Sequence, residues 1–443
     1  MRKTIFGCLG AAAVTFALQF TPADVQASFL GACDPRNPCD QVGCDPCDKT
    51  WDCDPCIPLQ GCGPKLGQWF LNGHIETGFF ANGHGRKSAY DGTPEVTQFV
   101  NGRAYNAGTG NTGLLQNTRL TDGQVNQVYI SMGKSVDGRR GLDIGGTVDF
   151  TWGSDAYLVQ ARGLEWGAGH GGPDTEGRWG TGDYFAAFAQ AYAEVAYGRW
   201  NVIAGKFYAP FGIDSYKSTE NFFYSWSPTK AIAPTMGGGA LAFYKASDQL
   251  MLIGGWIMPE EIGETSKNNF VAGGFIWAPV KNLNVRYVFA TGENTYAGNA
   301  FGGTPYDLYV HSLTTTYQLS KRLTNVLDWT YVQVQPDRTV PNMYSYGLMN
   351  QLTYQYNKQW AFGTRFGMLS DERFGTDAIL DLYTVSLGAN WTPNKWLTVK
   401  PEVRYDWAYG PDKKVFDRGV EDGIFVGTKA YQVSGGVSAV VKF

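Results

Sequence analysis

The chain has 443 residues and a formal net charge of −4 at neutral pH, a balance that gives no indication of a nucleic-acid partner. Charged residues make up 17% of the chain, against roughly 25% in typical soluble domains, whereas aromatic residues make up 15% and glycines number 57. No uninterrupted apolar run of about 18 residues follows the N-terminal region, so we expect no transmembrane helix. The composition instead predicts many short strands with one apolar face.

Residues 1–27 have the features of a secretory signal peptide. The basic residues Arg2 and Lys3 precede an apolar run from Ile5 to Phe20, which is short for a membrane span. A polar stretch then leads to the small-x-small cleavage site Val25-Gln26-Ala27. We therefore expect this segment to be removed on export.

Residues 28–65 form a second segment, rich in Cys, Pro and Asp and without apolar periodicity. It contains every cysteine expected in the mature chain: Cys33, Cys39, Cys44, Cys47, Cys53, Cys56 and Cys62. We place the segment in the oxidising periplasm and interpret the cysteines as disulfide candidates, with no metal and no cofactor. Their odd number also allows bonds to other envelope proteins. The two CDPC tetrads leave a zinc site or a redox pair as alternatives, and Leu30-Gly31-Ala32-Cys33 is similar to a lipobox, which would lipidate Cys33.

Residues 66–443 show the alternation of apolar and polar residues that is typical of strands with one apolar face. In the final stretch, "YQVSGGVSAVVKF", the apolar side chains share one face and the polar ones the other, with Val440 as the exception. A last strand that ends in Phe443 resembles the terminal strand of outer-membrane barrels, which implies recognition by the barrel-assembly machinery. The pattern predicts a transmembrane antiparallel β-barrel, since a closed barrel leaves no unpaired backbone in lipid. A soluble multi-strand β protein is the alternative.

The connections between the predicted strands are of two kinds. Tight polar turns fall near 137–138, 198–199, 247–248, 281–282, 321, 358 and 394–395, whereas long connections cover about 82–123, 153–186, 208–239, 259–268, 291–305, 336–343, 370–379 and 409–428. Such one-sided asymmetry is typical of outer-membrane barrels, with the long loops outward. Counting the turns predicts 16 strands with both termini on the tight-turn side, and 14 to 18 strands also fit.

One block resembles a known family. The carrying pieces are Gly153-Ser154-Asp155-Ala156-Tyr157, Gln190-Ala191-Tyr192-Ala193-Glu194, Gly205-Lys206-Phe207-Tyr208, Asn221-Phe222-Phe223-Tyr224-Ser225 and Pro234-Thr235-Met236. They resemble the putative beta-barrel porin-2 (OmpL-like) family, a resemblance that covers most of residues 66–443 and is specific in the central third. The family has His in place of Lys206 and often Glu in place of Asp214. The resemblance implies an outer-membrane diffusion pore and names no solute.

Alternation then gives candidate residues for a pore wall. The side chains expected to line the pore are Glu76, Asp149, Glu194, Arg286, Arg365, Lys400, Glu402 and Arg404. If the early acidic residues and the late basic ones lie on opposite walls, a transverse field would orient dipolar solutes. The alternative is a set of salt bridges inside the barrel, such as Lys400–Glu402–Arg404–Asp406, that brace the wall.

The third long connection, from Ala209 to Gly239, is a candidate constriction. In sixteen-stranded general porins this connection folds inward, and by that resemblance we expect the same here. Its candidate residues are Asp214, Lys217, Glu220, Phe222, Phe223 and Tyr224. A loop packed over the mouth, or against a neighbouring subunit, is the alternative.

The sequence therefore predicts an outer-membrane porin for small hydrophilic solutes, with the lipid bilayer as a partner and a homotrimer as one candidate assembly. An enzyme is not expected, because His74 and Glu76 come without the serine or carboxylate motif of known barrel hydrolases. The alternative function is a structural or adhesive envelope barrel, cross-linked through its cysteines and with little transport.

Overall fold

The computed structural model describes the chain from residue 68 to its end, apart from several connections. The described residues are 68–83, 97–100, 103–106, 123–165, 179–181, 184–259, 262, 268–294, 306–335, 342–372, 379–410, 413–414, 416–421 and 424–443. The predicted signal peptide (1–27) and the cysteine segment (28–65) lie outside these residues and stay predictions.

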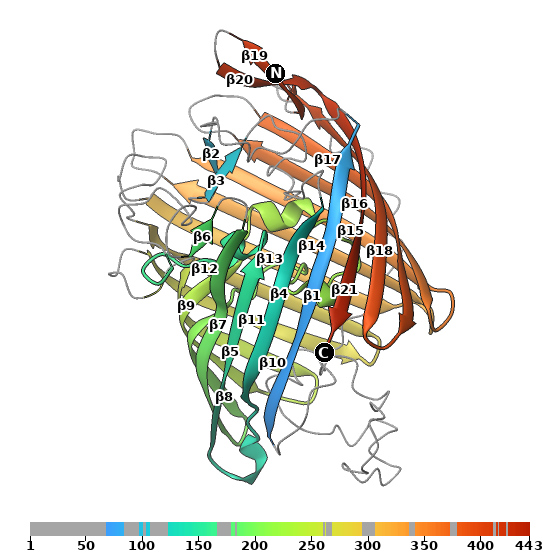
Figure 1. Cartoon of the computed structure of the whole chain (residues 1–443). Helices are drawn as coiled ribbons and strands as arrows, with labels where there is room; N and C mark the ends of the chain where they lie inside the picture. The colour runs from blue at the N-terminus through green and yellow to red at the C-terminus, as the bar shows by residue number, and fades with distance from the viewer. Residues whose placement is uncertain are drawn as a thin grey trace.

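A closed barrel of 16 antiparallel strands accounts for most of the described chain (Figure 1). Its strands are β1 (Trp69–Asn82), β4 (Gln124–Lys134), β5 (Asp143–Gly153), β7 (Tyr184–Tyr197), β8 (Trp200–Tyr208), β9 (Met236–Lys245), β10 (Leu250–Pro259), β11 (Asn268–Val280), β12 (Leu283–Asn294), β13 (Tyr306–Gln318), β14 (Leu323–Gln335), β15 (Met343–Gln355), β16 (Trp360–Glu372), β17 (Ile379–Asn394), β18 (Leu397–Tyr409) and β21 (Tyr431–Lys442). Each pairs with the next, and β1 pairs with both β4 and β21. The predicted fold and strand number are confirmed.

Shorter elements lie in the long connections and turns. They are the strands β2 (Thr97–Val100), β3 (Arg103–Asn106), β6 (Gly180–Thr181), β19 (Phe416–Glu421) and β20 (Ile424–Lys429), and the 3-10 helices η2 (Gly138–Arg140), η3 (Ala156–Val159), η4 (Ser218–Glu220) and η5 (Pro228–Ala231). β2 pairs with β3, and β19 pairs with β20. No helix in the described part of the chain has the length and apolar character needed to cross a membrane.

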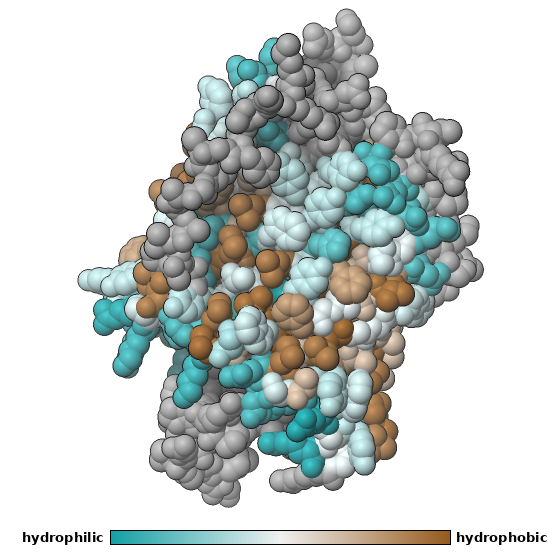
Figure 2. All heavy atoms as spheres, turned by 180° about the vertical axis from the view of Figure 1, so that it is seen from behind, coloured by the Kyte–Doolittle hydropathy of each residue, from teal (hydrophilic) through white to brown (hydrophobic). Residues whose placement is uncertain are grey.

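The two faces of the wall follow the predicted alternation. On β18, Val403 and Tyr405 are exposed on the outer surface, whereas Glu402, Arg404 and Asp406 are buried inside the barrel. Apolar and aromatic side chains gather across the middle of the outer surface (Figure 2). Period-two alternation therefore directs apolar side chains outward and places buried polar groups inside the barrel.

The tight turns are built from side chains that satisfy the turning backbone. The Oδ1 atom of Asn357 accepts hydrogen bonds from the backbone N–H groups of Gln359, at 2.8 Å, and Trp360, at 2.9 Å. Asn394 does the same at its own turn, and Gly198 takes a positive φ of 60°. Asn and Gly suit these positions because the Asn side chain bonds locally and Gly has no Cβ.

The seam between the first and last strands includes the final residue. The backbone N–H of Phe443 donates to the carbonyl of Gly73 at 3.0 Å, and the N–H of Gly73 donates back at 2.9 Å. A Cβ atom on Gly73 would lie 2.6 Å from the Phe443 ring, so the glycine makes room for it. The last residue thus completes the hydrogen bonding of the closed wall.

Candidate functional site

The connection between β8 and β9 enters the barrel and contacts its inner wall on many sides. We call residues 209–235 the inserted segment. Its side chains Tyr216, Trp226 and Ile232 are buried, and its hydrogen-bond partners lie on β4, β5, β12, β13, β14, β16 and β18. The green helix η5, which belongs to this segment, lies within the ring of strands (Figure 1). This is the connection in which the sequence placed a candidate constriction.

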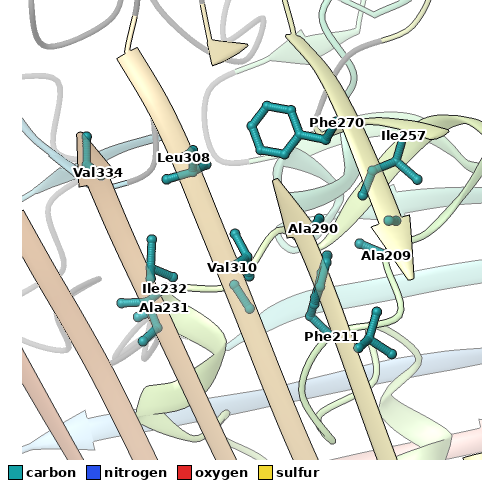
Figure 3. Close-up of a cluster of buried hydrophobic side chains, with 14 of the residues drawn as sticks. Ala209, Phe211, Ala231, Ile232, Ile257, Phe270, Ala290, Leu308, Val310 and Val334 are labelled. Atoms are coloured by element: carbon teal, nitrogen blue, oxygen red, sulfur yellow. The ribbon is translucent and has the colours of Figure 1, made fainter. Parts of the chain in front are cut away.

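The base of the inserted segment is held by apolar contacts. Its two ends meet where the N–H of Ala209 donates to the carbonyl of Thr235 at 3.1 Å. The base residues Ala209, Phe211, Ala231, Ile232 and Ala233 belong to one cluster with inward-facing residues of β8 to β18. Figure 3 shows several of these side chains together, with Ala290 and Val310 of the wall among them. Burial of this apolar surface stabilises the base.

One carboxylate, that of Asp328 on β14, connects both arms of the base. Its Oδ2 atom accepts a hydrogen bond from the Thr229 hydroxyl at 2.6 Å and another from the N–H of Ile213 at 3.2 Å. The neighbouring N–H of Gly212 donates to the Ser312 hydroxyl at 2.8 Å, and its carbonyl accepts from Arg286. The beginning and the end of the inserted segment are therefore fixed to the same part of the wall.

The tip of the inserted segment, which we define as residues 214–228, is held by buried charges. Glu402 on β18 accepts from the N–H of Ser225 at 2.8 Å and from its hydroxyl at 2.7 Å. Arg365 on β16 donates to the Ser225 carbonyl at 2.8 Å, and Arg404 donates to the Trp226 carbonyl at 3.0 Å. The side chains of Glu402, Arg365, Arg404 and Ser225 are at most 3% exposed. Charge-assisted bonds of this kind are about twice as strong as neutral ones.

The charges that hold the tip are also paired with each other. The Nη2 atom of Arg365 lies 3.3 Å from the Oε1 atom of Glu402, and the Nε atom of Arg404 lies 2.7 Å from the Oδ1 atom of Asp406. Arg365 additionally lies over the ring of Phe223, with its guanidinium carbon 4.5 Å from the ring centre. Because each buried guanidinium has a carboxylate partner, the cost of removing these charges from water is offset.

The same tip also bonds to both sides of the β1–β21 seam. The ammonium of Lys400 on β18 donates to the carbonyls of Ser218, at 2.5 Å, and Asn221, at 2.7 Å. Gln127 on β4 accepts from the N–H of Ser218 at 3.1 Å. The Tyr224 hydroxyl donates to the side chain of Asn126, also on β4, at 2.9 Å. The tip is thus fastened to strands on both sides of the seam.

Lys217 is the tip residue that reaches toward β5. Its ammonium lies 3.7 Å from a carboxylate oxygen of Asp149 and 5.3 Å from the centre of the Tyr129 ring. Burial acts to lower the pKa of Lys217, but the carboxylates of Asp149 and Glu220 outweigh it and raise that pKa above the usual 10.5. Glu220 lies three residues further on, in η4. Because its pKa is raised, Lys217 is charged at neutral pH.

Glycines on the wall give the aromatic tip its place. A Cβ on Gly363 of β16 would collide with the Phe222 ring, and one on Gly388 of β17 would lie 2.9 Å from the Phe223 ring. A Cβ on Gly367 would similarly meet a side-chain carbon of Pro228 at 2.6 Å. Glycine within a strand often marks such a close approach, and here it lets the tip pack directly on the wall.

A cavity lies beside the tip at the tight-turn end of the barrel. It has a volume of about 190 Å³ and is lined by Phe222, Thr324, Thr353, Gln355, Gln359, Ala361, Asn390 and Thr392. Most of the lining comes from β14 to β17, and the inserted segment contributes Phe222 to it. This places open space on one side of the tip.

Two of the predicted pore-lining residues lie on β1 and β7. Glu76 is buried on β1, and Glu194 on β7 accepts from the Asn201 side chain at 2.6 Å. The other six, Asp149, Arg286, Arg365, Lys400, Glu402 and Arg404, each bond to or pair with the inserted segment. Most of the predicted wall residues therefore contact the inserted segment, mainly at residues next to the predicted constriction residues in sequence.

Some of the basic and acidic residues of the wall lie on strands that are close together. β18, which carries Lys400 and Arg404, is separated only by β21 from β1, which carries Glu76. Closure brings these two basic residues close to Glu76, and the broader expectation of acidic and basic walls facing each other across the barrel stays a prediction. The predicted pair of Arg404 with Asp406 is present, whereas Lys400 donates to carbonyls of the inserted segment.

A second connection also packs inside. The residues after β5, including η3, lie against β7, and Glu165 there forms a 2.7 Å ion pair with Lys206 of β8. Both side chains are almost fully buried. Lys206 is the position at which the sequence departs from the family's His, and here it has a carboxylate partner. Among the described residues no cluster of side chains is suited to hold a metal ion.

The sequence did not identify several residues that fix the tip. Ser225, Gln127 and Asn126 look like ordinary polar residues until the inserted segment is seen against the wall. A signal was present in the glycines: Gly363 and Gly367 occupy inward positions on either side of Arg365, where close approach of another chain segment is expected.

The fold is similar to those of solved porins and other outer-membrane proteins. An anion-selective porin from Comamonas acidovorans matches with a TM-score of 0.53 and 10% sequence identity, over 85% of this chain and 99% of the porin. The outer membrane channel DcaP of Acinetobacter baumannii matches with a TM-score of 0.52 and 10% identity, over 87% and 100%. OmpT of Vibrio cholerae, solved in a trimer form, matches with a TM-score of 0.51 and 12% identity, over 86% and 100%.

Identities this low support the shared fold alone. Among curated proteins, none matches the sequence significantly. A family model described as "Putative beta-barrel porin-2, OmpL-like" matches residues 71–443, which is nearly the whole barrel. The chain therefore belongs to this family of outer-membrane porins.

Proposed function

We propose that the chain is a diffusion channel for small hydrophilic solutes whose narrowest part is formed by the inserted segment. The observation that carries this proposal is the fastening of the tip at Ser225 to β16 and β18 and at Ser218 to β4. A segment held at these points leaves solutes only the space between itself and the wall. The tip residues Asp214, Lys217, Glu220, Phe222, Phe223 and Tyr224 are then the constriction residues.

Selectivity would come from charges beside that space. A solute that passes a narrow throat loses part of its hydration, and charges there act more strongly than in bulk water. We assign Arg365, Glu402 and Arg404 to the anchoring of the tip, since their partners lie on it. Lys217, whose side chain is 24% exposed, is the better candidate for direct contact with ions. We assign no catalytic role to any residue.

The placement of the chain in the envelope completes the proposal. Family membership places the barrel in the outer membrane, and the tight-turn side would then face the periplasm together with residues 28–65. Phe443, at the barrel seam, would serve recognition by the barrel-assembly machinery. A homotrimer is supported by the trimer form of the OmpT structure, and disulfides from the cysteine segment would link the barrel to other envelope proteins.

A structural or adhesive barrel with little transport is the second candidate. The extensive packing of the inserted segment favours it, because a segment bonded on several sides fills much of the interior. Liposome swelling with sugars of graded size separates the two functions. A channel admits small sugars and excludes large ones, whereas a closed structural barrel admits none.

Deleting Ser215–Glu220 tests the constriction. We expect higher single-channel conductance in planar bilayers and a higher size limit in liposome swelling, because the tip loses the residues that reach β4 and β5. Deleting residues 166–171, in another long connection, is the size-matched control. Unchanged conductance in the Ser215–Glu220 deletion would contradict the constriction, and absence of conductance in the wild type would contradict the channel.

A further inference from the structure

The cavity at the tight-turn end differs in chemistry from the charged surroundings of the tip. None of its eight lining residues is charged: three are threonines, three carry side-chain amides, and Phe222 and Ala361 complete it. Hydroxyls and amides both donate and accept hydrogen bonds, so the wall matches a neutral ligand with many hydroxyl groups. A cavity lined in this way gives no electrostatic preference to an ion.

The aromatic part of the lining is fixed in position. The Phe222 ring packs against the bare backbone at Gly363, where even a methyl group would collide with it. When the Asn390 amide is oriented so that its nitrogen faces the neighbouring acceptors, it donates to the Phe222 carbonyl at 3.0 Å. Phe223 packs edge-on against Phe222, with ring centres 5.1 Å apart. The cavity thus has a rigid apolar plate on one side.

The polar part of the lining is equally regular. Thr324 and Thr353 are directly paired across β14 and β15, and Thr353 is paired in turn with Gly363, the residue under Phe222. Within the described chain, neither threonine hydroxyl has a hydrogen-bond partner. Gln355 and Gln359 continue the lining toward the turn, with side-chain amides that donate to backbone carbonyls at 2.6 and 3.3 Å. Two adjacent hydroxyls therefore remain available to a ligand beside the aromatic plate.

We infer that this cavity is a binding site for one ring of a neutral sugar, or a cyclic polyol of that size, on the tight-turn side of the constriction. The apolar C–H face of such a ring would pack on Phe222 while its hydroxyls bond to Thr324 and Thr353. The volume of about 190 Å³ exceeds the roughly 30 Å³ share of one water and lies below the roughly 300 Å³ typical of larger ligands. The inference rests on the proposed channel and names a class of solute for it.

Block of the ion current by D-glucose tests the site. In planar bilayers containing the full-length mature protein, we expect glucose to reduce the wild-type current in a saturable way. Substituting both Thr324→Val and Thr353→Val should raise the half-blocking concentration on the order of tenfold, because two hydrogen bonds are lost without a change of shape. Phe222→Leu, which removes the aromatic face but keeps an apolar side chain, should raise it several-fold.

Thr316→Val is the matched control, because Thr316 is a buried inward-facing threonine on β13 outside the cavity lining. Saturation-transfer NMR in detergent, with glucose and with glucose 6-phosphate, gives a second readout that needs no conduction. Glucose signals that vanish in the double valine variant support the site. Equal block and equal NMR signals in all variants would overturn the inference while leaving the channel intact, whereas a wild type with no current at all contradicts the channel itself.

Discussion

The base and the tip of the inserted segment are held in the same barrel by different forces. The base packs Phe211 and Ile232 into an apolar cluster on the inner wall. The tip, around Ser225, is held by Arg365, Glu402 and Arg404, which are buried and paired. Apolar contacts are lost gradually as side chains are trimmed, whereas a buried ion pair fails abruptly when one partner is removed. The base should therefore tolerate substitution better than the tip.

This difference matters for function because only the tip borders the space that we assign to solutes. Phe222 lines the cavity, and Lys217 is the partly exposed charge beside Asp149. The base sets where the segment leaves the wall, while the tip sets how wide the passage is. Substitutions can therefore separate stability from conductance, and the expected effect decreases from the buried charges through the apolar base to the partly exposed Lys217.

The largest effect is expected from Glu402→Ala. The change leaves the guanidinium of Arg365 buried without its carboxylate and removes both acceptors of Ser225, at a cost of roughly 3–5 kcal/mol. We expect the tip to detach from β16 and β18, so that single-channel conductance rises and the current becomes noisier. The control is Val403→Ala, because Val403 directly follows Glu402 in sequence and lies on the outer face of the barrel. This variant should conduct like the wild type. A Glu402→Ala channel with wild-type conductance would refute the role of these charges.

A smaller effect, on stability alone, is expected from Ile232→Ala. Ile232 is fully buried in the base cluster, and its truncation should lower the unfolding free energy by roughly 2–4 kcal/mol. The measurement is the temperature at which the folded barrel changes its mobility on a gel. Val271→Ala, on the outer surface of β11, should shift that temperature much less. If conductance in Ile232→Ala rose as far as in Glu402→Ala, base and tip would act as one unit and would not differ in the way proposed.

The wall was more predictable than what it encloses. Strand positions, tight turns and the inward direction of residues such as Glu402 and Arg404 all follow from period-two alternation, which is a local property of the sequence. The family resemblance also pointed to the right part of the chain, since Asn221 to Ser225 belong to the tip. These features could be predicted because lipid imposes the same pattern on every strand.

The contacts between wall and tip could not be predicted in the same way. Period-two alternation says that Arg365 points inward but not that it meets Ser225, a residue 140 positions away. Nor does it say which inward charges lie close together, as those of β18 and β1 do on either side of β21. The segment itself has no period, so its path depends on contacts with the closed barrel. The signal that the sequence did carry was glycine at inward positions of β16 and β17.

The smallest effect is expected from Lys217→Gln, which removes a charge from the tip without breaking its anchors. The carboxylates of Asp149 and Glu220 raise the pKa of Lys217, so the side chain keeps its proton throughout the range from about pH 6 to 9. Titration of Lys217 should therefore not change the ion selectivity of the wild type in that pH range. The variant should be more selective for cations than the wild type, at nearly unchanged conductance. Reversal potentials in asymmetric KCl should show the cation/anion permeability ratio rising roughly twofold to fivefold. Lys245→Gln, which removes a charge paired with Asp248 near a tight turn, is the matched control. Because the anchors stay intact, a large rise in conductance in Lys217→Gln would mean that this residue, and not the network around Ser225, holds the tip in place.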